Sequence, residues 1–311
     1  MIIKAPIDLE LTQNSGQTSQ PPWKLDNNIY SDVVVADNKA GLFQVKQKEN
    51  NLDFNFIGDI SNNEATKKIK TIFDLDFNLN KFYKYLNNQP ELADMTNFCR
   101  DLRLFLAKDK FECVISSVCS ANNSIVRWTK SIDDIKKSWG NKYTYSEKDY
   151  FTFPDVSDFK NIYCDDVEEF ECCSNLNNPG ECINNLKSCG VGYRAPYMKK
   201  ASEIFTLEMD LEDISKMSYD EAFDTMLKVP GVGPKVADCI LLYGFNFRQA
   251  FPTDVWIKRI VSYLYFDGKD INVSKIREFG MEEFGDYAGY VQLYLFHYAR
   301  MSGLMKKLKE M

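Results

Sequence analysis

The sequence predicts an α+β fold, in which an N-terminal antiparallel, twisted β-sheet domain precedes a mostly α-helical region. Two patterns support this prediction. Between residues 30 and 59 apolar and polar residues alternate with a period of two, which is typical of strands with one buried face. Residues 219–243 have the pattern of a helix, a glycine-containing hairpin and a second helix. We therefore expect a sheet domain with flanking helices over residues 1–90 and a helical region over residues 91–311.

The predicted strands are followed directly by a helix start. Leu52, Phe54 and Phe56 are separated by polar residues, which places their side chains on one face of a strand. Ser61 and Glu64 then match the capping box, in which the two side chains bond each other's backbone N–H groups at a helix start. The helix that begins there opens a helical region that we expect to continue to the C-terminus.

The hairpin within residues 219–243 is suited to binding an anion. Gly231 and Gly233 stand where the backbone must turn tightly or approach a partner closely, and Pro234 suits the first position of the second helix. Unpaired N–H groups and the positive end of the helix dipole would meet there, so phosphate is the expected ligand. Lys235 follows at once and would lie beside the bound backbone.

A simpler interpretation is that the two glycines only cap a surface turn and that Lys235 is a solvated cation. Three additions favour the functional interpretation: Pro234 at the helix start, Cys239 one turn after the lysine, and Asp254 nineteen residues beyond it. Asp254 is also placed to cap a predicted helix over residues 255–264, because aspartate accepts the free N–H groups of a first turn. That structural role and a catalytic one can coexist.

Composition limits the class of protein. The 311 residues are 44% hydrophobic and 27% charged, which is typical of a soluble globular chain with two or three domains or subdomains. Asp8 and Glu10 interrupt the N-terminal apolar stretch, so we expect no signal peptide, and no apolar run reaches the roughly eighteen residues of a membrane span. The formal net charge of -7 argues mildly against a nucleic-acid partner, although backbone donors at the hairpin would reduce the need for Lys and Arg.

Cysteine and histidine usage argues against a metal site. Nine cysteines without an export signal are expected to be reduced thiols, and five of them fall in one segment: Cys164, Cys172, Cys173, Cys182 and Cys189. That segment has no C-x-x-C pair and no nearby histidine, so a zinc site there is disfavoured. His297, the only histidine, lies on an apolar predicted helix, where a satisfied or partly buried imidazole is favoured over a catalytic base. The scarcity of histidine also argues against histidine-dependent triads and zinc hydrolase sites. We expect no metal.

The motif VPGVGPKVADC at 229–239, followed by FPTDV at 251–255, resembles the helix-hairpin-helix DNA glycosylases. Within them it is most similar to the eukaryotic-type 8-oxoguanine DNA glycosylase/AP lyase family. The resemblance implies that Lys235 is a nucleophile that forms a Schiff base with the sugar, and that Asp254 stabilises the developing positive charge. Gly231, Gly233 and Lys235 would contact the DNA phosphates.

Other segments extend the resemblance. Gly16 lies in a loop resembling the one whose glycine carbonyl detects the extra N7 hydrogen of 8-oxoguanine, although the following residues, TSQPPWKL, depart from the family's aromatic-Arg-Trp pattern. The resemblance implies that Gln292 bonds the purine edge while Cys239 and Phe296 contact its two faces. It also implies four contacts around the opposite base: Asn122 fills the gap, Arg127 contacts the orphaned cytosine, Tyr193 wedges between bases and Arg194 reads the cytosine.

The resemblance implies a bifunctional enzyme of base excision repair. It would excise 8-oxoguanine, preferentially opposite cytosine, from duplex DNA by base flipping and Schiff-base chemistry. Two alternatives stay open: a glycosylase of the same superfamily for another damaged or mismatched base, and a noncatalytic DNA-binding scaffold. We expect a monomer without cofactors, and without an iron-sulfur cluster because no cysteine follows Cys239. The expected location is cytoplasmic and nucleoid-associated in a bacterium, or nuclear in a eukaryote.

Overall fold

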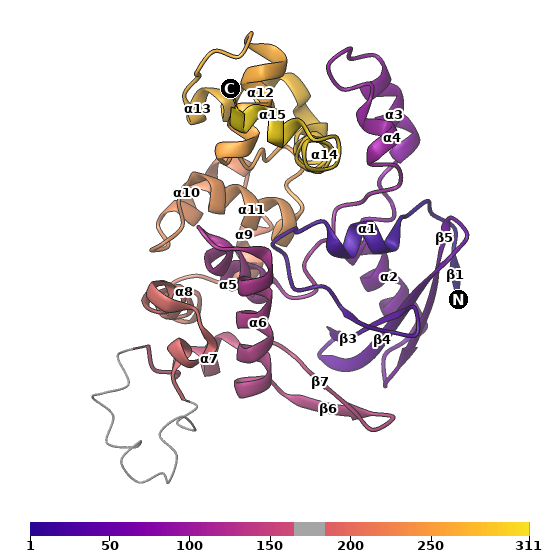
Figure 1. Cartoon of the computed structure of the whole chain (residues 1–311). Coiled ribbons are helices and arrows are strands. Elements are labelled where there is room, and N and C mark those ends of the chain that lie inside the picture. The colour runs from indigo at the N-terminus through magenta and orange to yellow at the C-terminus, as the bar shows by residue number, and fades with distance from the viewer. Residues whose placement is uncertain (165–183, 311) are drawn as a thin grey trace.

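The protein is described by a computed structural model that covers residues 1–164 and 184–310. A twisted antiparallel sheet, drawn in indigo in Figure 1, lies beside a larger helical region that runs to the C-terminus. The predicted α+β class, with the sheet first, is confirmed. In the two described ranges no helix combines the length and the apolar character that a membrane crossing requires.

Five strands form the N-terminal sheet in the order β1-β5-β4-β3-β2, and all neighbouring pairs are antiparallel. The strands are β1 (Ile2–Ile3), β2 (Lys24–Asp26), β3 (Ile29–Ala36), β4 (Lys39–Lys48) and β5 (Asn51–Ile57), with α1 (Leu9–Asn14) between the first two. The apolar residues of the predicted alternation share one face, where Val45 lies opposite Phe54 and Phe43 opposite Phe56. Helix α2 (Asn62–Ile72) packs on this face and completes its core.

Helices make up most of the remaining chain. The α-helices are α3 (Leu79–Asn87), α4 (Met95–Phe98), α5 (Lys110–Ser120), α6 (Ile125–Trp139), α7 (Val156–Phe159), α8 (Ala195–Leu207), α9 (Leu211–Ile214), α10 (Tyr219–Leu227), α11 (Pro234–Phe245), α12 (Val255–Tyr265), α13 (Val273–Phe284), α14 (Ala288–Met301) and α15 (Leu304–Glu310). Three short 3-10 helices accompany them: η4 (Leu186–Cys189), η5 (Gly192–Arg194) and η6 (Gly285–Tyr287).

Two local predictions are refined. At the start of α2 the Ser61 hydroxyl accepts the N–H of Glu64 at 3.2 Å, which is one half of the predicted capping box. Helix α3 packs with the helical region, because Leu79, Phe82 and Leu86 belong to that core. The predicted division of the chain at residue 90 stays a prediction.

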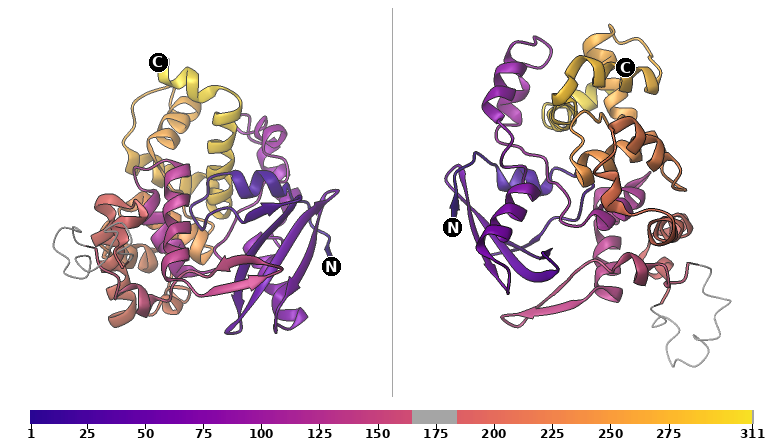
Figure 2. Two further views of the ribbon diagram at one scale, coloured as in Figure 1. Left: turned by 60° about the horizontal axis from the view of Figure 1, so that its bottom comes forward. Right: turned by 180° about the vertical axis from the view of Figure 1, so that it is seen from behind.

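The mostly helical region also contains a two-stranded hairpin that the sequence did not predict, β6 (Lys142–Tyr145) and β7 (Lys148–Phe151). The views in Figure 2 show this hairpin extending from the helical region to the sheet. Tyr150 packs there against Val33 and Leu42, which point away from α2. Both faces of the sheet are therefore partly covered, whereas the alternation predicted a single buried face.

A buried cluster of four charged side chains also joins the sheet to the helical region. Asp32 on β3 is paired with Lys108 and Lys136, and both lysines lie 3.8 Å from the carboxylate of Glu112 on α5. Burial opposes ionisation of Asp32, but the two ammonium groups outweigh it and lower the pKa of this carboxyl. Because removing one partner would leave a buried charge uncompensated, the cluster stabilises one arrangement of β3 against α5 and α6.

Candidate active site

The helix-hairpin-helix is formed by α10, the hairpin and α11. Ser218 begins α10 with a complete capping box, since its hydroxyl accepts the N–H of Glu221 and the Glu221 carboxylate accepts the N–H of Ser218. Gly231 at the tip has φ +82°, and a Cβ there would lie 2.7 Å from the ring of Tyr197, so only glycine fits. Gly233 precedes Pro234 at the start of α11, and both glycines are exposed.

The amine and the carboxylate predicted for catalysis stand at two helix starts. Lys235 lies in the first turn of α11 and is partly buried. Asp254 caps α12, because its Oδ1 accepts the N–H groups of Trp256 at 2.9 Å and Ile257 at 2.8 Å. One oxygen takes both bonds, so within the described residues Oδ2 of Asp254 has no hydrogen-bond partner and can meet another group.

A single cavity of about 70 Å³ brings together all six residues predicted for catalysis and for the base pocket: Lys235, Asp254, Gly16, Cys239, Gln292 and Phe296. Lys235 and Asp254 also line a wider groove of about 720 Å³, whose walls include Asn122 and Arg127. The amine and the carboxylate therefore lie where a narrow pocket meets a groove lined by residues predicted to contact the opposite base.

The loop that carries Gly16 is held on both sides of the glycine. Gln17 is buried and makes three hydrogen bonds: its amide donates to Ser15 Oγ at 2.9 Å and to the Arg103 carbonyl at 3.0 Å, and its Oε1 accepts the N–H of Phe105. Gly16 has φ +85°, and a Cβ there would lie 2.6 Å from Cδ1 of Ile125. This loop is thus positioned by bonds to distant segments and packed against the start of α6.

Thr18 is a cavity residue that the sequence analysis missed. It lines both the cavity and the groove, and its Oγ1 lies 3.2 Å from the Ser117 hydroxyl. The sequence signal that could have identified Thr18 as a pocket residue is its position two residues after Gly16. The departure from the family's aromatic pattern begins at this residue, so Thr18 belongs to the part of the loop that differs from that pattern.

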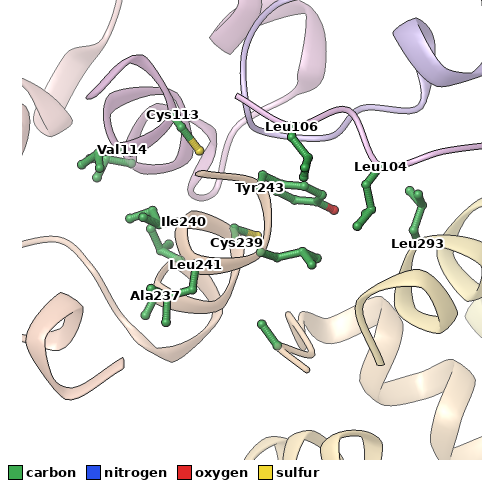
Figure 3. Close-up of a cluster of buried hydrophobic side chains, with 14 of the residues drawn as sticks. Leu104, Leu106, Cys113, Val114, Ala237, Cys239, Ile240, Leu241, Tyr243 and Leu293 are labelled. Atoms are coloured by element: carbon green, nitrogen blue, oxygen red, sulfur yellow. The ribbon is translucent and has the colours of Figure 1, made fainter. Parts of the chain in front are cut away.

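Cys239 lines the cavity. Figure 3 shows it on α11 with Tyr243, whose ring projects toward Leu104 and Leu106, while Cys113 and Val114 belong to the neighbouring helix α5. Burial raises the pKa of the Cys239 thiol, and the nearby charge of Lys235 opposes this without cancelling it. Burial therefore favours the protonated thiol over the thiolate.

Two residues of α14 complete the pocket. Gln292 is 8% exposed, and its Oε1 has no hydrogen-bond partner in the described part of the chain. A buried acceptor without a partner costs free energy, so Gln292 is prepared to receive a donor from a ligand. Phe296, one turn later, is half-buried with the Arg300 guanidinium 5.7 Å from its ring centre.

Two family models together match residues 1–285 of this chain. Residues 1–114 match the 8-oxoguanine DNA glycosylase N-terminal domain, and residues 115–285 match the HhH-GPD superfamily base excision DNA repair protein. The probable N-glycosylase/DNA lyase of Methanothermobacter thermautotrophicus is 43% identical over 304 residues, which are 97% of this chain and 96% of that protein. The chain belongs to the 8-oxoguanine N-glycosylase/DNA lyase family. The resemblance inferred from the hairpin motif is confirmed.

Other members of the family are also similar over nearly the full length. The N-glycosylase/DNA lyase of Saccharomyces cerevisiae is 26% identical over 95% of this chain and 84% of its own. The structure of MBOgg1 with a low-affinity DNA ligand has a TM-score of 0.80 at 30% identity, covering 97% of this chain and 96% of that one. Clostridium acetobutylicum 8-oxoguanine glycosylase/lyase, with double-stranded DNA containing cytosine opposite 8-oxoguanine, has a TM-score of 0.76 at 29% identity, covering 97% and 98%.

The four residues predicted around the opposite base lie on two neighbouring segments. Asn122, in the loop between α5 and α6, has φ +49° and an exposed side chain, and Arg127 is exposed on the first turns of α6. Tyr193 is 59% exposed, whereas Arg194 is buried with its guanidinium bonded to the carbonyls of Ala121 and Asn122. The roles that this glycosylase/lyase family implies for these residues stay predictions.

No group of three or more His, Cys, Asp or Glu side chains is placed to hold a metal ion within residues 1–164 and 184–310. Cys99, Cys113, Cys119, Cys189 and Cys239 are buried free thiols there. Most of the cysteine-rich segment, including Cys172, Cys173 and Cys182, lies outside the described residues. The expectation that this family member uses no metal and no iron-sulfur cluster stays a prediction.

Proposed function

We propose that this chain is a bifunctional DNA glycosylase/AP lyase that excises 8-oxoguanine from duplex DNA, preferentially opposite cytosine, in base excision repair. The observation that carries the proposal is the shared cavity, in which Lys235 and Asp254 meet Gly16, Cys239, Gln292 and Phe296. A flipped nucleotide needs a pocket for its base and reactive groups at its sugar, and this cavity supplies both.

The chemistry follows from the two helix-start residues. As the bond between C1′ and the base breaks, its electron pair leaves with the base and positive charge develops on the sugar, which the Asp254 carboxylate stabilises. After giving a proton to the departing base, the amine of Lys235 bonds to C1′. The sugar ring then opens as its oxygen takes a second proton from the amine, which leaves a Schiff base. Loss of a proton from C2′ then expels the 3′ phosphate, so strand cleavage follows base removal.

The pocket is suited to both faces and one edge of a purine. Gln292 offers an unpaired acceptor, Cys239 offers a neutral thiol, and Phe296 offers an aromatic ring. The peptide of Gly16 lies in the same wall, where its carbonyl can accept the N7 hydrogen that 8-oxoguanine carries and guanine lacks. Because the loop is held by Gln17, this carbonyl is positioned before the base arrives.

DNA binding by an acidic chain is explained by where the donors lie. The exposed Gly231 and Gly233 present backbone N–H groups at the positive end of α11, and Lys235 and Arg127 border the adjacent groove. The formal net charge of -7 is therefore compatible with local attraction of phosphate. We further propose that the protein acts as a monomer on genomic DNA without a cofactor.

Borohydride trapping on a duplex with 8-oxoguanine opposite cytosine tests the proposal. The wild-type chain is expected to form a covalent adduct, whereas Lys235→Gln is expected to bind the same duplex without adduct or excision. Absence of an adduct with folded wild-type protein that binds the duplex would instead favour the noncatalytic scaffold. A panel of other damaged or mismatched bases separates the remaining alternative, since a better substrate than 8-oxoguanine would reassign the pocket.

A further inference from the structure

The Arg194 guanidinium is engaged by the loop that carries Asn122. Its Nε donates to the Ala121 carbonyl at 2.8 Å, and its Nη2 donates to the Ala121 carbonyl and, at 2.8 Å, to the Asn122 carbonyl. The guanidinium also lies 4.4 Å from the ring centre of Tyr193. One buried side chain thus contacts both segments that the family resemblance places against the duplex, although Asn122 and Arg194 are 72 residues apart.

The two carbonyls need this partner. Ala121 caps the C-terminal end of α5, and among the described residues no backbone N–H bonds the carbonyl of Ala121 or Asn122. A helix C-terminus carries partial negative charge, so a cation is favourable there, and hydrogen bonds from a charged donor are stronger than neutral ones. Arg194 therefore stabilises the turn in which Asn122 adopts φ +49° with its side chain exposed.

The other end of the Tyr193 segment is fixed as well. Tyr197, one turn after Tyr193 on α8, has its ring centre 6.5 Å from the Tyr193 ring in an edge-on arrangement. The Tyr197 ring also packs closely over Gly231 at the hairpin tip. The wedge residue is therefore held between Arg194 on one side and the hairpin on the other.

We propose that Arg194 is a positioning residue. It fixes the positions of Asn122 and Tyr193 relative to each other, so that both side chains can insert into the duplex together. This inference rests on the proposed function. It differs from the role implied by the resemblance, in which the arginine reads the opposite cytosine, because here Nε and Nη2 are bonded to protein carbonyls. A positioning residue affects base extrusion whatever stands opposite the lesion, whereas a reading residue acts only through that base.

The deciding substrate is a duplex with 8-oxoguanine opposite a tetrahydrofuran abasic analogue, which offers no base to read. Single-turnover excision is measured on this duplex and on duplexes with C, A, G or T opposite the lesion. Arg194→Ala is expected to slow excision by 10-fold or more on all five duplexes while the ratio between opposite bases is kept. Arg194→Lys, which keeps the charge and can reach one carbonyl, is expected to recover part of the rate.

Matched variants sharpen the comparison. Arg127→Ala removes an exposed arginine without these carbonyl bonds and is expected to flatten the preference for cytosine. Its loss of rate is therefore expected to differ between duplexes, whereas that of Arg194→Ala is not. Arg100→Ala removes an exposed arginine outside both the cavity and the groove and is expected to behave as wild type. The double variant Asn122→Ala/Arg194→Ala is expected to lose less excision rate than the product of the two single-variant losses, because one residue acts through the other.

Full activity of Arg194→Ala on the abasic duplex, with a loss confined to cytosine, would overturn the proposal and establish a reading residue. If Arg194→Ala fails to fold, the excision rates of Arg194→Lys on the abasic and cytosine duplexes are compared in the same way. Hydrogen exchange gives an independent measurement: the amides of residues 122–125 are expected to exchange faster in Arg194→Lys, and unchanged exchange there would also overturn it. If the wild type does not excise 8-oxoguanine, the proposed function fails, and the exchange measurement still tests the positioning.

Discussion

Lys235 and Asp254 begin two different helices, yet their side chains line one cavity. The hairpin leads directly into the first turn of α11, which carries the Lys235 amine. The Asp254 carboxylate is itself the cap of α12. The catalytic geometry is therefore built from ordinary helix-capping chemistry, and each end can be altered separately.

Asp254 has two functions that two substitutions separate. Asparagine keeps an oxygen that can accept the N–H groups of Trp256 and Ile257, but it removes the negative charge. Asp254→Asn is expected to keep most of the free energy of unfolding while the excision rate falls by about 10²–10³-fold. Asp254→Ala is expected to lose the charge and, in addition, about 1 kcal/mol of stability from the lost cap. Urea unfolding and single-turnover excision measure the two effects, and equal stability of both variants would contradict the capping argument.

Gly16 is expected to tolerate no Cβ. Gly16→Ala adds left-handed strain of about 1–2 kcal/mol and brings a methyl group against Ile125, so the loop or α6 must shift. A displacement of about 1 Å costs roughly 10²-fold in rate, and excision is expected to fall by 10-fold or more. Gly303→Ala is the matched control, because Gly303 has φ +81° with nothing within 4 Å of its Cβ position. Its excision rate is expected to be unchanged, and Ile125→Ala is expected to restore part of the Gly16→Ala loss.

Gln292 and Gln17 are buried glutamines that differ in how well their polar atoms are satisfied. Gln292→Leu removes an unpaired Oε1 and is expected to leave stability unchanged or raised, while affinity for the lesion duplex falls by about tenfold or more. Gln17→Leu breaks three hydrogen bonds and is expected to destabilise the fold by about 1–3 kcal/mol for each partner left unpaired. Thermal unfolding and equilibrium binding test the pair. A large stability loss in Gln292→Leu would show that its Oε1 has a partner.

His297 is the only histidine, so its titration can be followed without interference. Burial lowers the pKa of this imidazole below its ordinary value of 6.5, and the charge of Arg300 lowers it further, while Asp8 acts in the opposite direction. Between this lowered pKa and 6.5, the His297 imidazole therefore binds a proton in the unfolded chain but not in the folded chain. The contribution to stability is present above pH 6.5 and is lost as the pH falls through the lowered pKa.

The measurement is the NMR titration of the single imidazole Cε1 proton. A midpoint below 6.5 is expected, and Arg300→Gln is expected to move the midpoint upward. The stability of His297→Gln is expected to depend less on pH between neutrality and pH 6 than that of wild type. A midpoint at or above 6.5 would contradict the effect of burial.

Elements defined by nearby residues were predictable from the sequence. The alternation on β4 and β5, the two helices of the hairpin motif and the cap at Asp254 each depend on residues within a few positions of one another. The hairpin β6–β7 was not predicted, because its Tyr150 is buried by Val33 and Leu42, more than a hundred residues earlier in the chain. The buried cluster around Asp32 could not be predicted either, because its members are distant in the chain. Each of its Lys and Glu residues, taken alone, would be expected to be solvated.

The sequence by itself determined the α+β order, the helix-hairpin-helix and the lysine-aspartate pair, because backbone geometry, capping and spacing are local properties. Only the tertiary structure decided that Gly16 and Gln292 face the same cavity as that pair, that Ile125 packs on Gly16, and that Arg194 is buried against the Asn122 loop. These relationships join segments far apart in the chain. They depend on how whole helices pack, and helix packing is set by the complete core.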